Sequence, residues 1–190
     1  CGSESRHERE FCLLMEEEFR RLGVPFTRDE AAGTACQSDG WNLLASLPGE
    51  GEPILLSAHM DTVAPGNGIV PVLESGVIRS AGDTVLGSDD KSGVAAILEA
   101  LESILEEGIP HRPVEILFSV CEELGLLGSQ HADFSQVKSR EAVVLDSSRT
   151  GKIIHRSTHN GRLRFTIHGK AAHAATSPEE GIHALKAAAR

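Results

Sequence analysis

Apolar residues recur at helical spacing near the start of the chain. They lie three or four positions apart, at Cys12, Met15, Phe19 and Leu22, and this spacing places side chains on one face of a helix. Ser5 followed three residues later by Glu8 is typical of a capping box at a helix start, and Gly23 and Pro25 end the pattern. The pattern predicts a first helix over residues 5–22.

Short apolar runs follow at intervals and predict the strands of a buried sheet. The runs cover residues 41–47, 54–58, 114–120 and 142–145, and each is bounded by polar residues, as expected of strands covered on both faces. Between Val70 and Arg79, apolar residues flank the turn sequence Glu74-Ser75-Gly76, which predicts a small hairpin.

Helical patterns occupy the segments between these runs. A long helix is predicted to open at Ser88 or Asp89 and to end before Gly108, because apolar residues recur along one face between these points. A second helix is predicted over residues 124–134. Alternation of strand and helix predicts an α/β fold with a mostly parallel sheet and helices on both faces.

The pattern changes near the end of the chain. Polar and apolar residues alternate from 162 to 167, which predicts a strand with one exposed face. Pro178 precedes a helical pattern over residues 182–189. We expect this strand and helix to open a second domain, so that residues 1–158 form one domain and residues 159–190 the start of another.

Composition and charge exclude several classes of protein. The formal net charge is −10, with no Tyr and one Trp, which argues against a nucleic-acid binder, since such proteins need cationic surface and stacking aromatics. No stretch approaches the ~20 apolar residues that span a bilayer, so no membrane partner is expected. The four cysteines lack a C-x-x-C pair, which favours reduced thiols and a cytoplasmic location.

Acidic and histidine side chains follow three of the predicted strands and open the long helix. They are His59 and Asp61, Asp89 and Asp90, Glu122 and Glu123, and Asp146. Each alone has an ordinary structural explanation. A histidine two residues before an aspartate is usually a surface feature or a core hydrogen bond, an acidic pair at a helix start is usually a cap, and an aspartate after a strand is commonly a turn former. However, ligands of open α/β sheets bind outside the carboxyl ends of the strands, and clustered carboxylates repel unless a cation compensates them. Their common position therefore favours a zinc, cobalt or manganese site.

Four motifs in order carry a family resemblance. They are Ser-Ala-His-Met-Asp-Thr-Val at 57–63, Gly-Ser-Asp-Asp-Lys-Ser-Gly at 87–93, Glu-Glu-Leu-Gly at 122–125 and Leu-Asp-Ser at 145–147. The chain resembles the di-zinc exopeptidase family that includes peptidase T, glutamate carboxypeptidase and the amino-acid deacylases. Residues 65–68 and 169–174 are similar to the peptidase T-like aminopeptidases in particular. The resemblance implies a zinc exopeptidase-like fold.

The resemblance also implies a set of metal ligands. His59, Asp89 and Asp146 would hold one ion, and Asp89 would bridge to a second ion held also by Glu123. Two divalent ions are implied, zinc first, with cobalt or manganese as alternatives. Paired ions of this kind activate a water molecule and polarise the scissile carbonyl.

Further roles follow from the same resemblance. Asp61 would orient the ring of His59 through its other nitrogen, and Glu122 would be the general base. His173, on the lid domain, would help to bind the reacting oxygen in the partner subunit's site, which implies a homodimer formed through the lid. Cys121 adjoins Glu122, but with no histidine placed beside it we interpret it as a buried reduced thiol.

The implied function is metal-dependent hydrolysis of peptide bonds in small peptides. Residues 1–158 would form the metallopeptidase catalytic domain, and residues 159–190 the start of the lid or dimerisation domain. Two alternatives stay open: a deacylase or carboxypeptidase acting on N-acyl amino acids, and a catalytically inactive binding or dimerisation scaffold.

The resemblance finally predicts that part of the family's chain is missing. Family members supply one more histidine to the second metal from a segment after the lid domain, and they carry a further helical segment before the part that matches residues 3–5. None of the other histidines stands in that motif: His111, His131, His155, His159, His168 and His183. We therefore expect an internal fragment of a longer chain, truncated at both ends, with an incomplete second metal site and no activity alone.

Overall fold

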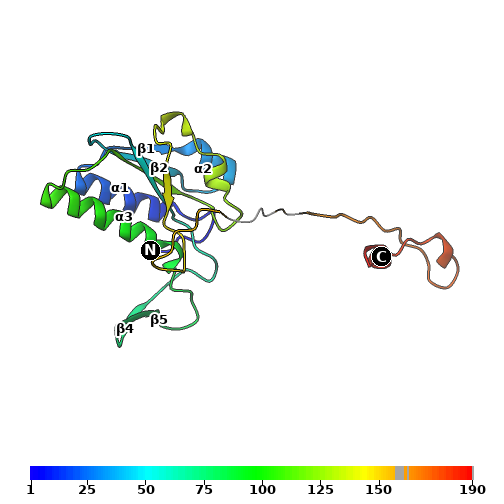
Figure 1. Ribbon diagram of the computed structural model, residues 1–190. Helices are drawn as coiled ribbons and strands as arrows, with labels where there is room; N and C mark the ends of the chain where they lie inside the picture. Colours follow the sequence, from blue (N-terminus) through cyan, green and yellow to red (C-terminus); the bar gives the residue numbers. More distant parts are fainter. Residues whose placement is uncertain (157–160, 162, 190) are drawn as a thin grey trace. The chain divides into compact units, whose positions relative to one another are not determined.

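The computed structural model describes residues 1–156, 161 and 163–189. The chain divides into two compact units, Cys1–Ser148 and Arg149–Arg190. The expected domain boundary between residues 158 and 159 lies outside the described residues. The first unit contains a five-stranded sheet with helices packed against it (Figure 1).

Three strands of this sheet run parallel. The order is β1-β2-β6-β3-β7, with bounds β1 Phe26–Asp29, β2 Asn42–Leu47, β3 Ile54–His59, β6 Val114–Ser119 and β7 Ala142–Val144. β3 pairs in parallel with both β6 and β7. β2 pairs antiparallel with β6, and β1 pairs antiparallel with β2. The four predicted strands are present, and the α/β fold is confirmed.

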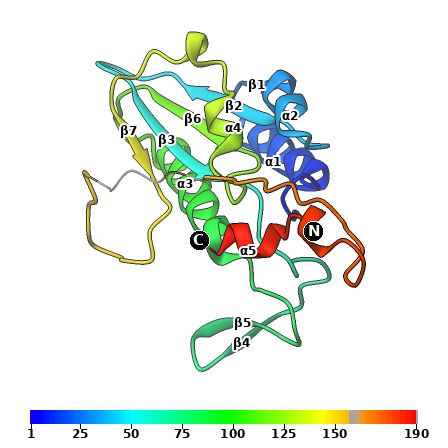
Figure 2. The same cartoon turned by 90° about the vertical axis from the view of Figure 1, so that its right-hand side faces the viewer.

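Two helices cover one face of the sheet. α1 (Arg9–Leu22) and α3 (Ser88–Glu107) lie side by side against it (Figure 2). Phe19 of α1 stacks on Phe118 of β6 with ring centroids 5.5 Å apart, and both are fully buried. On the opposite face a smaller cluster forms where Val137 packs against three leucines, Leu44, Leu55 and Leu117. The larger apolar cluster lies between the sheet and these two helices, and it holds β3 and β6 against α1 and α3.

The start of α1 differs from the prediction. The helix begins at Arg9, and the capping box is wrong because the hydroxyl of Ser5 donates instead to Asp61 Oδ2, at 2.6 Å. The N–H of Arg9 donates to Asp39 Oδ1 at 3.0 Å. The residues before α1 run beside the segment after β3, with a parallel bridge between Glu4 and Thr62.

Two elements of the first unit were not predicted and one is shorter than predicted. β1 and α2 (Glu30–Cys36) come from a stretch with few large apolar residues, and β1 has only four residues at the sheet edge. In place of a helix over 124–134, the structure has α4 (Leu127–Gln130) followed by the 3-10 helix η1 (Phe134–Gln136). α2 and α4 pack against each other.

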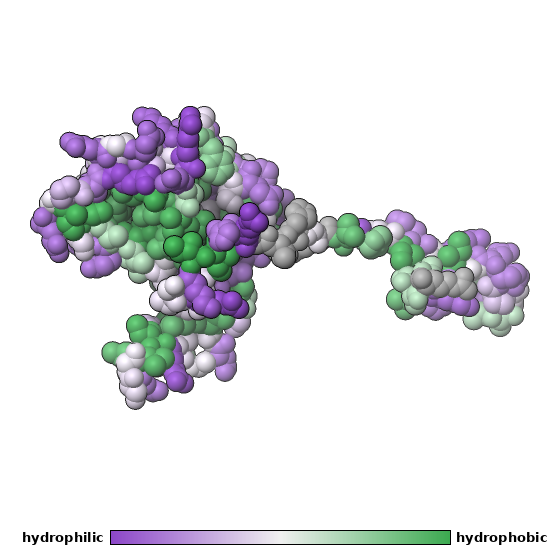
Figure 3. Space-filling model, in the orientation of Figure 1, coloured by the Kyte–Doolittle hydropathy of each residue, from purple (hydrophilic) through white to green (hydrophobic). Residues whose placement is uncertain are grey.

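The predicted hairpin is present and lies apart from the sheet. It consists of β4 (Pro71–Glu74) and β5 (Val77–Ser80), which pair only with each other. Figure 3 shows apolar residues on this hairpin, and Leu73 and Ile78 are exposed. The hairpin therefore contributes little to the core that positions the strand ends.

The second unit contains little regular structure among its described residues. It has η2 (Pro178–Glu180), α5 (Ala184–Ala188) and a bridge between Lys170 and Ile182. The predicted strand is wrong for residues 163–167, which have no neighbouring strand to complete a ladder; residue 162 lies outside the described residues. Within the described part of the chain, no helix has the length and apolar character needed to cross a membrane.

Candidate metal centre

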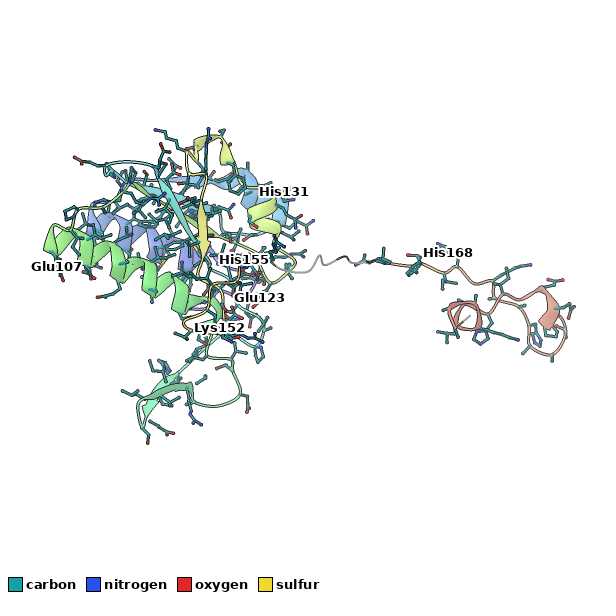
Figure 4. The ribbon with its side chains drawn as sticks, in the orientation of Figure 1. Glu107, Glu123, His131, Lys152, His155 and His168 are labelled. Atoms are coloured by element: carbon teal, nitrogen blue, oxygen red, sulfur yellow. The ribbon has the colours of Figure 1, made fainter. Side chains whose placement is uncertain are left out.

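The parallel strands bring the candidate residues to one end of the first unit. His59 ends β3 and pairs with Ser119 at the end of β6, so the residues that follow both strands emerge at the same sheet edge. Figure 4 shows Glu123 at this end and Glu107, the last residue of α3, at the other. The N-terminal end of α3 thus faces the strand ends.

Two groups of candidate ligands meet at His59. One ligand atom each from His59, Asp89 and Asp146 lies within 4.8 Å of the others, and the same holds for His59, Glu122 and Glu123. His59 Nε2 lies 3.1 Å from Asp89 Oδ1 and 3.8 Å from Glu122 Oε2. His59, Asp89 and Asp146 therefore lie together as predicted, and Glu123 joins them only through the second group, which shares His59; their role as metal ligands stays a prediction.

The ring of His59 has a defined orientation. Its Nδ1 lies 2.9 Å from the main-chain oxygen of Asp61 and 3.3 Å from Oδ1 of the same residue. This contact leaves Nε2 directed toward the carboxylates. Burial opposes the charged imidazole, but the bond to Asp61 and the neighbouring carboxylates raise the pKa of His59 to about 9.

Asp61 also holds the loop that carries the two glutamates. Its side chain is fully buried and accepts the N–H groups of Glu122 at 2.8 Å and Glu123 at 3.2 Å. Burial raises the pKa of Asp61, but the bonds from His59 and Ser5 outweigh burial and lower the pKa overall. Asp61 therefore stays a carboxylate that joins the ring of His59 to this loop.

The two aspartates at the start of α3 have different environments. Both depart from helical dihedral angles, with Asp89 at φ −89°, ψ 108°. Asp90 is buried and its Oδ1 accepts the N–H of Gly93 at 3.1 Å. The Asp89 side chain is 71% exposed and contacts His59. Thus Asp90 serves the helix start, while Asp89 is free to face the cluster.

The donor chemistry of the cluster fits a divalent cation. Burial first, and then repulsion from neighbouring carboxylates, raises the pKa of Glu122, Glu123 and Asp146. A cation would relieve this repulsion, and an imidazole with several carboxylates is a suitable ligand set for zinc. Beside Asp89 and Asp146 there is a cavity of about 160 Å³, larger than the space of one water molecule.

The remaining candidates lie elsewhere or are inert. In the second unit, His173 Nδ1 accepts the N–H groups of Ala175 at 3.2 Å and Thr176 at 3.3 Å, and its substrate role stays a prediction. His159 lies outside the described residues. Burial raises the pKa of the Cys121 thiol well above its ordinary value, which is the reverse of what a thiol nucleophile needs.

Two residues near the site were missed by the sequence interpretation. Glu8 is buried and bonds to Cys121, next to the two glutamates, and Asn42 is buried and bonds to Val120. Only the S-x-x-E spacing marked Glu8, and it indicated a helix cap. Nothing in the local pattern marked Asn42, because its partners lie far along the chain.

The chain is similar to known peptidases in sequence and in fold. The model of peptidase family M28 matches residues 42–177. Carboxypeptidase G2 of Pseudomonas is 31% identical over 90% of this chain and 42% of its own length. A tripeptidase from Staphylococcus aureus has a TM-score of 0.80 at 29% identity, and aminopeptidase PepT from Bacillus cereus has 0.75 at 33%. Both matches cover 99% of this chain and 51% of the other.

The chain spans about half the length of the curated relatives that it matches first. The family model nevertheless covers most of the chain and includes every candidate metal ligand. The resemblance to zinc exopeptidases seen in the sequence is therefore confirmed.

Proposed function

The chain belongs to peptidase family M28, and from this premise we propose that the whole protein is a metal-dependent exopeptidase of small peptides, similar to a tripeptide aminopeptidase. The whole protein here means this chain with any further segment encoded with it. One observation carries the proposal: a ring nitrogen of buried His59 and carboxylate oxygens of Asp89 and Asp146 lie within 4.8 Å of one another.

The proposal assigns the metal ligands as the resemblance implies. His59, Asp89 and Asp146 would hold one ion, and Asp89 and Glu123 a second, with zinc the first choice. Bound zinc would polarise the scissile carbonyl and lower the pKa of a water molecule. The exposure of Asp89 and Asp146 supports this assignment, because a substrate can reach their side of the cluster.

Two further side chains would have roles beside the ligands: Glu122 would transfer protons, and Asp61 would orient His59. Glu122 would take the proton of the attacking water and deliver it to the leaving amine. Its carboxylate is 24% exposed and lies 3.8 Å from His59 Nε2, within reach of a reacting water beside the ligands. Asp61 would hold the ring of His59 through Nδ1, so that Nε2 stays directed at the ion.

The proposal extends to partners and location. We assign substrate binding to His173 and a homodimer to residues 159–190, as the resemblance implies. A cytoplasmic location is supported by the free thiols of Cys12, Cys36 and Cys121, all buried.

A second candidate function has specific support. A metal centre alone does not determine the substrate, so the cluster is equally compatible with a deacylase or carboxypeptidase acting on N-acyl amino acids. The similarity to carboxypeptidase G2 favours this alternative. An inactive scaffold is the third possibility, and metal content distinguishes it from the two enzymes.

Substrate tests on the zinc-loaded whole protein separate these functions. We expect a tripeptide with a free amino terminus to be cleaved after its first residue, and its N-acetylated form to be cleaved far more slowly. Chelation should abolish the activity and zinc should restore it. Mass spectrometry of the released amino acid and of the remaining dipeptide checks both results. Faster cleavage of N-acyl amino acids would replace the aminopeptidase by the deacylase. A protein that binds no zinc and cleaves no substrate would leave the scaffold.

A further inference from the structure

The loop after β6 is held in an unusual way. From residue 120 to residue 123, four consecutive backbone N–H groups donate to side chains rather than to another strand. The bonds are Val120 to Asn42 Oδ1 at 3.0 Å, Cys121 to Glu8 Oε1 at 2.8 Å, Glu122 to Asp61 Oδ1 at 2.8 Å and Glu123 to Asp61 Oδ2 at 3.2 Å. The position of this loop therefore depends on three side chains from distant parts of the sequence.

Glu8, like Asn42, is an acceptor that the proposed mechanism does not use. Its side chain has no exposed surface, and the hydroxyl of Ser38 donates to its second oxygen. A Cβ at Gly40 would lie 3.1 Å from Glu8 Cβ and 2.9 Å from Cys12 Sγ. A side chain at position 40 would therefore crowd the start of the Glu8 side chain, while the bonds from Ser38 and Cys121 hold its carboxylate.

The conformation of Cys121 makes this acceptor important. Cys121 has φ +52°, in the left-handed region that residues other than glycine rarely adopt. Such a conformation persists only where the surroundings impose it. The bond from the Cys121 N–H to Glu8 precedes the two bonds to Asp61, and this turn directs Glu122 and Glu123 toward His59.

We propose that Glu8 is a positioning residue for the site, which acts through the backbone of Cys121 to hold Glu122 and Glu123 in their reacting positions. The inference rests on the proposed function for its catalytic meaning. Glu8 contacts none of the candidate ligands itself. The segment before α1 thus supports the site at two points, through Glu8 and through Ser5, which donates a hydrogen bond to Asp61.

The chain offers a matched control for this inference. Glu115 is also a buried glutamate that holds a loop, since its carboxylate accepts the N–H groups of Lys138 at 3.0 Å and Ser139 at 2.9 Å. Those bonds connect β6 to the segment after η1, away from His59. Loss of Glu115 removes the same kind of bond without touching the proposed site.

The test compares variants of the zinc-loaded whole protein. Glu8→Ala should lower kcat by ~10- to 100-fold, the usual effect of lost support around a metal site, and leave KM unchanged. Glu8→Gln should recover most of kcat, because its amide oxygen still accepts the Cys121 N–H. Glu8→Asp, one methylene shorter, should not. Glu115→Ala should reduce the melting temperature without changing kcat.

A second readout does not depend on activity. In the metal-free protein, hydrogen exchange of residues 120–123 should be faster in Glu8→Ala and Glu8→Asp than in the wild type or Glu115→Ala. Equal exchange, or equal kcat in the Glu8 and Glu115 variants, would overturn the inference.

If Glu8→Ala does not fold, the comparison of Glu8→Asp with Glu8→Gln decides. If the wild type cleaves no peptide, the proposed function fails, and exchange alone then decides whether Glu8 holds the loop.

Discussion

Replacing Glu122 by glutamine in the whole protein should lower kcat by ~10² to 10⁴, the usual size of general acid-base catalysis. Glutamine keeps the size of the side chain but cannot take a proton from water. The N–H of Glu122 would still donate to Asp61, so the loop and the metal content should not change. The measurement is steady-state cleavage of a tripeptide beside the zinc content of the same sample.

A matched variant shows whether this loss is specific to the site. Glu107→Gln makes the same chemical change on an exposed glutamate at the opposite end of α3 (Figure 4), and it should leave kcat unchanged. Near-normal kcat in Glu122→Gln would mean that another group moves the proton. A parallel loss of zinc would instead make Glu122 a ligand.

The second large effect is expected on metal affinity. Loss of a residue that only hydrogen-bonds to a metal ligand typically costs ~10- to 100-fold in metal affinity. Asp89→Asn removes a proposed ligand itself and should weaken zinc binding by more than this. Asp89 Oδ1 lies 3.1 Å from His59 Nε2, and its charge acts on both Glu123 and Asp146. Loss of this one charge should therefore affect both groups of ligands. Calorimetric titration of the metal-free whole protein with zinc measures the effect.

Exposure makes this variant easy to interpret. The Asp89 side chain is 71% exposed, so the melting temperature of the metal-free protein should not fall. Asp83→Asn changes another exposed aspartate, outside both groups of ligands, and should bind zinc as the wild type does. Zinc affinity equal to the wild type in Asp89→Asn would remove Asp89 from the site.

The parallel strands and their polar ends were predictable because the relevant signals are local. Apolar runs such as 54–58 and 114–120 are long enough to mark buried strands, and each is followed at once by the polar residues that it carries to the sheet edge. Parallel pairing of β3 with β6 and β7 then brings His59, Glu123 and Asp146 together without further information.

The support of the site was not predictable, because its partners are distant. The S-x-x-E spacing of Ser5 and Glu8 fits a capping box, yet Ser5 bonds to Asp61, 56 residues away, and Glu8 to Cys121, 113 residues away. Tertiary contacts of this kind override the local preference. For a similar reason β1 was missed, since its four residues are ordered by pairing with β2 rather than by their own pattern.

Diffraction from crystals of the zinc-loaded whole protein, recorded on both sides of the zinc absorption edge, tests the central claim most directly. We expect an anomalous peak at ~2.0–2.1 Å from His59 Nε2, the usual zinc–nitrogen distance, with the carboxylates of Asp89 and Asp146 as further ligands. Anomalous peaks confined to other parts of the molecule, with His59 Nε2 still bonded to Asp89, would contradict the assignment of this cluster as the metal centre.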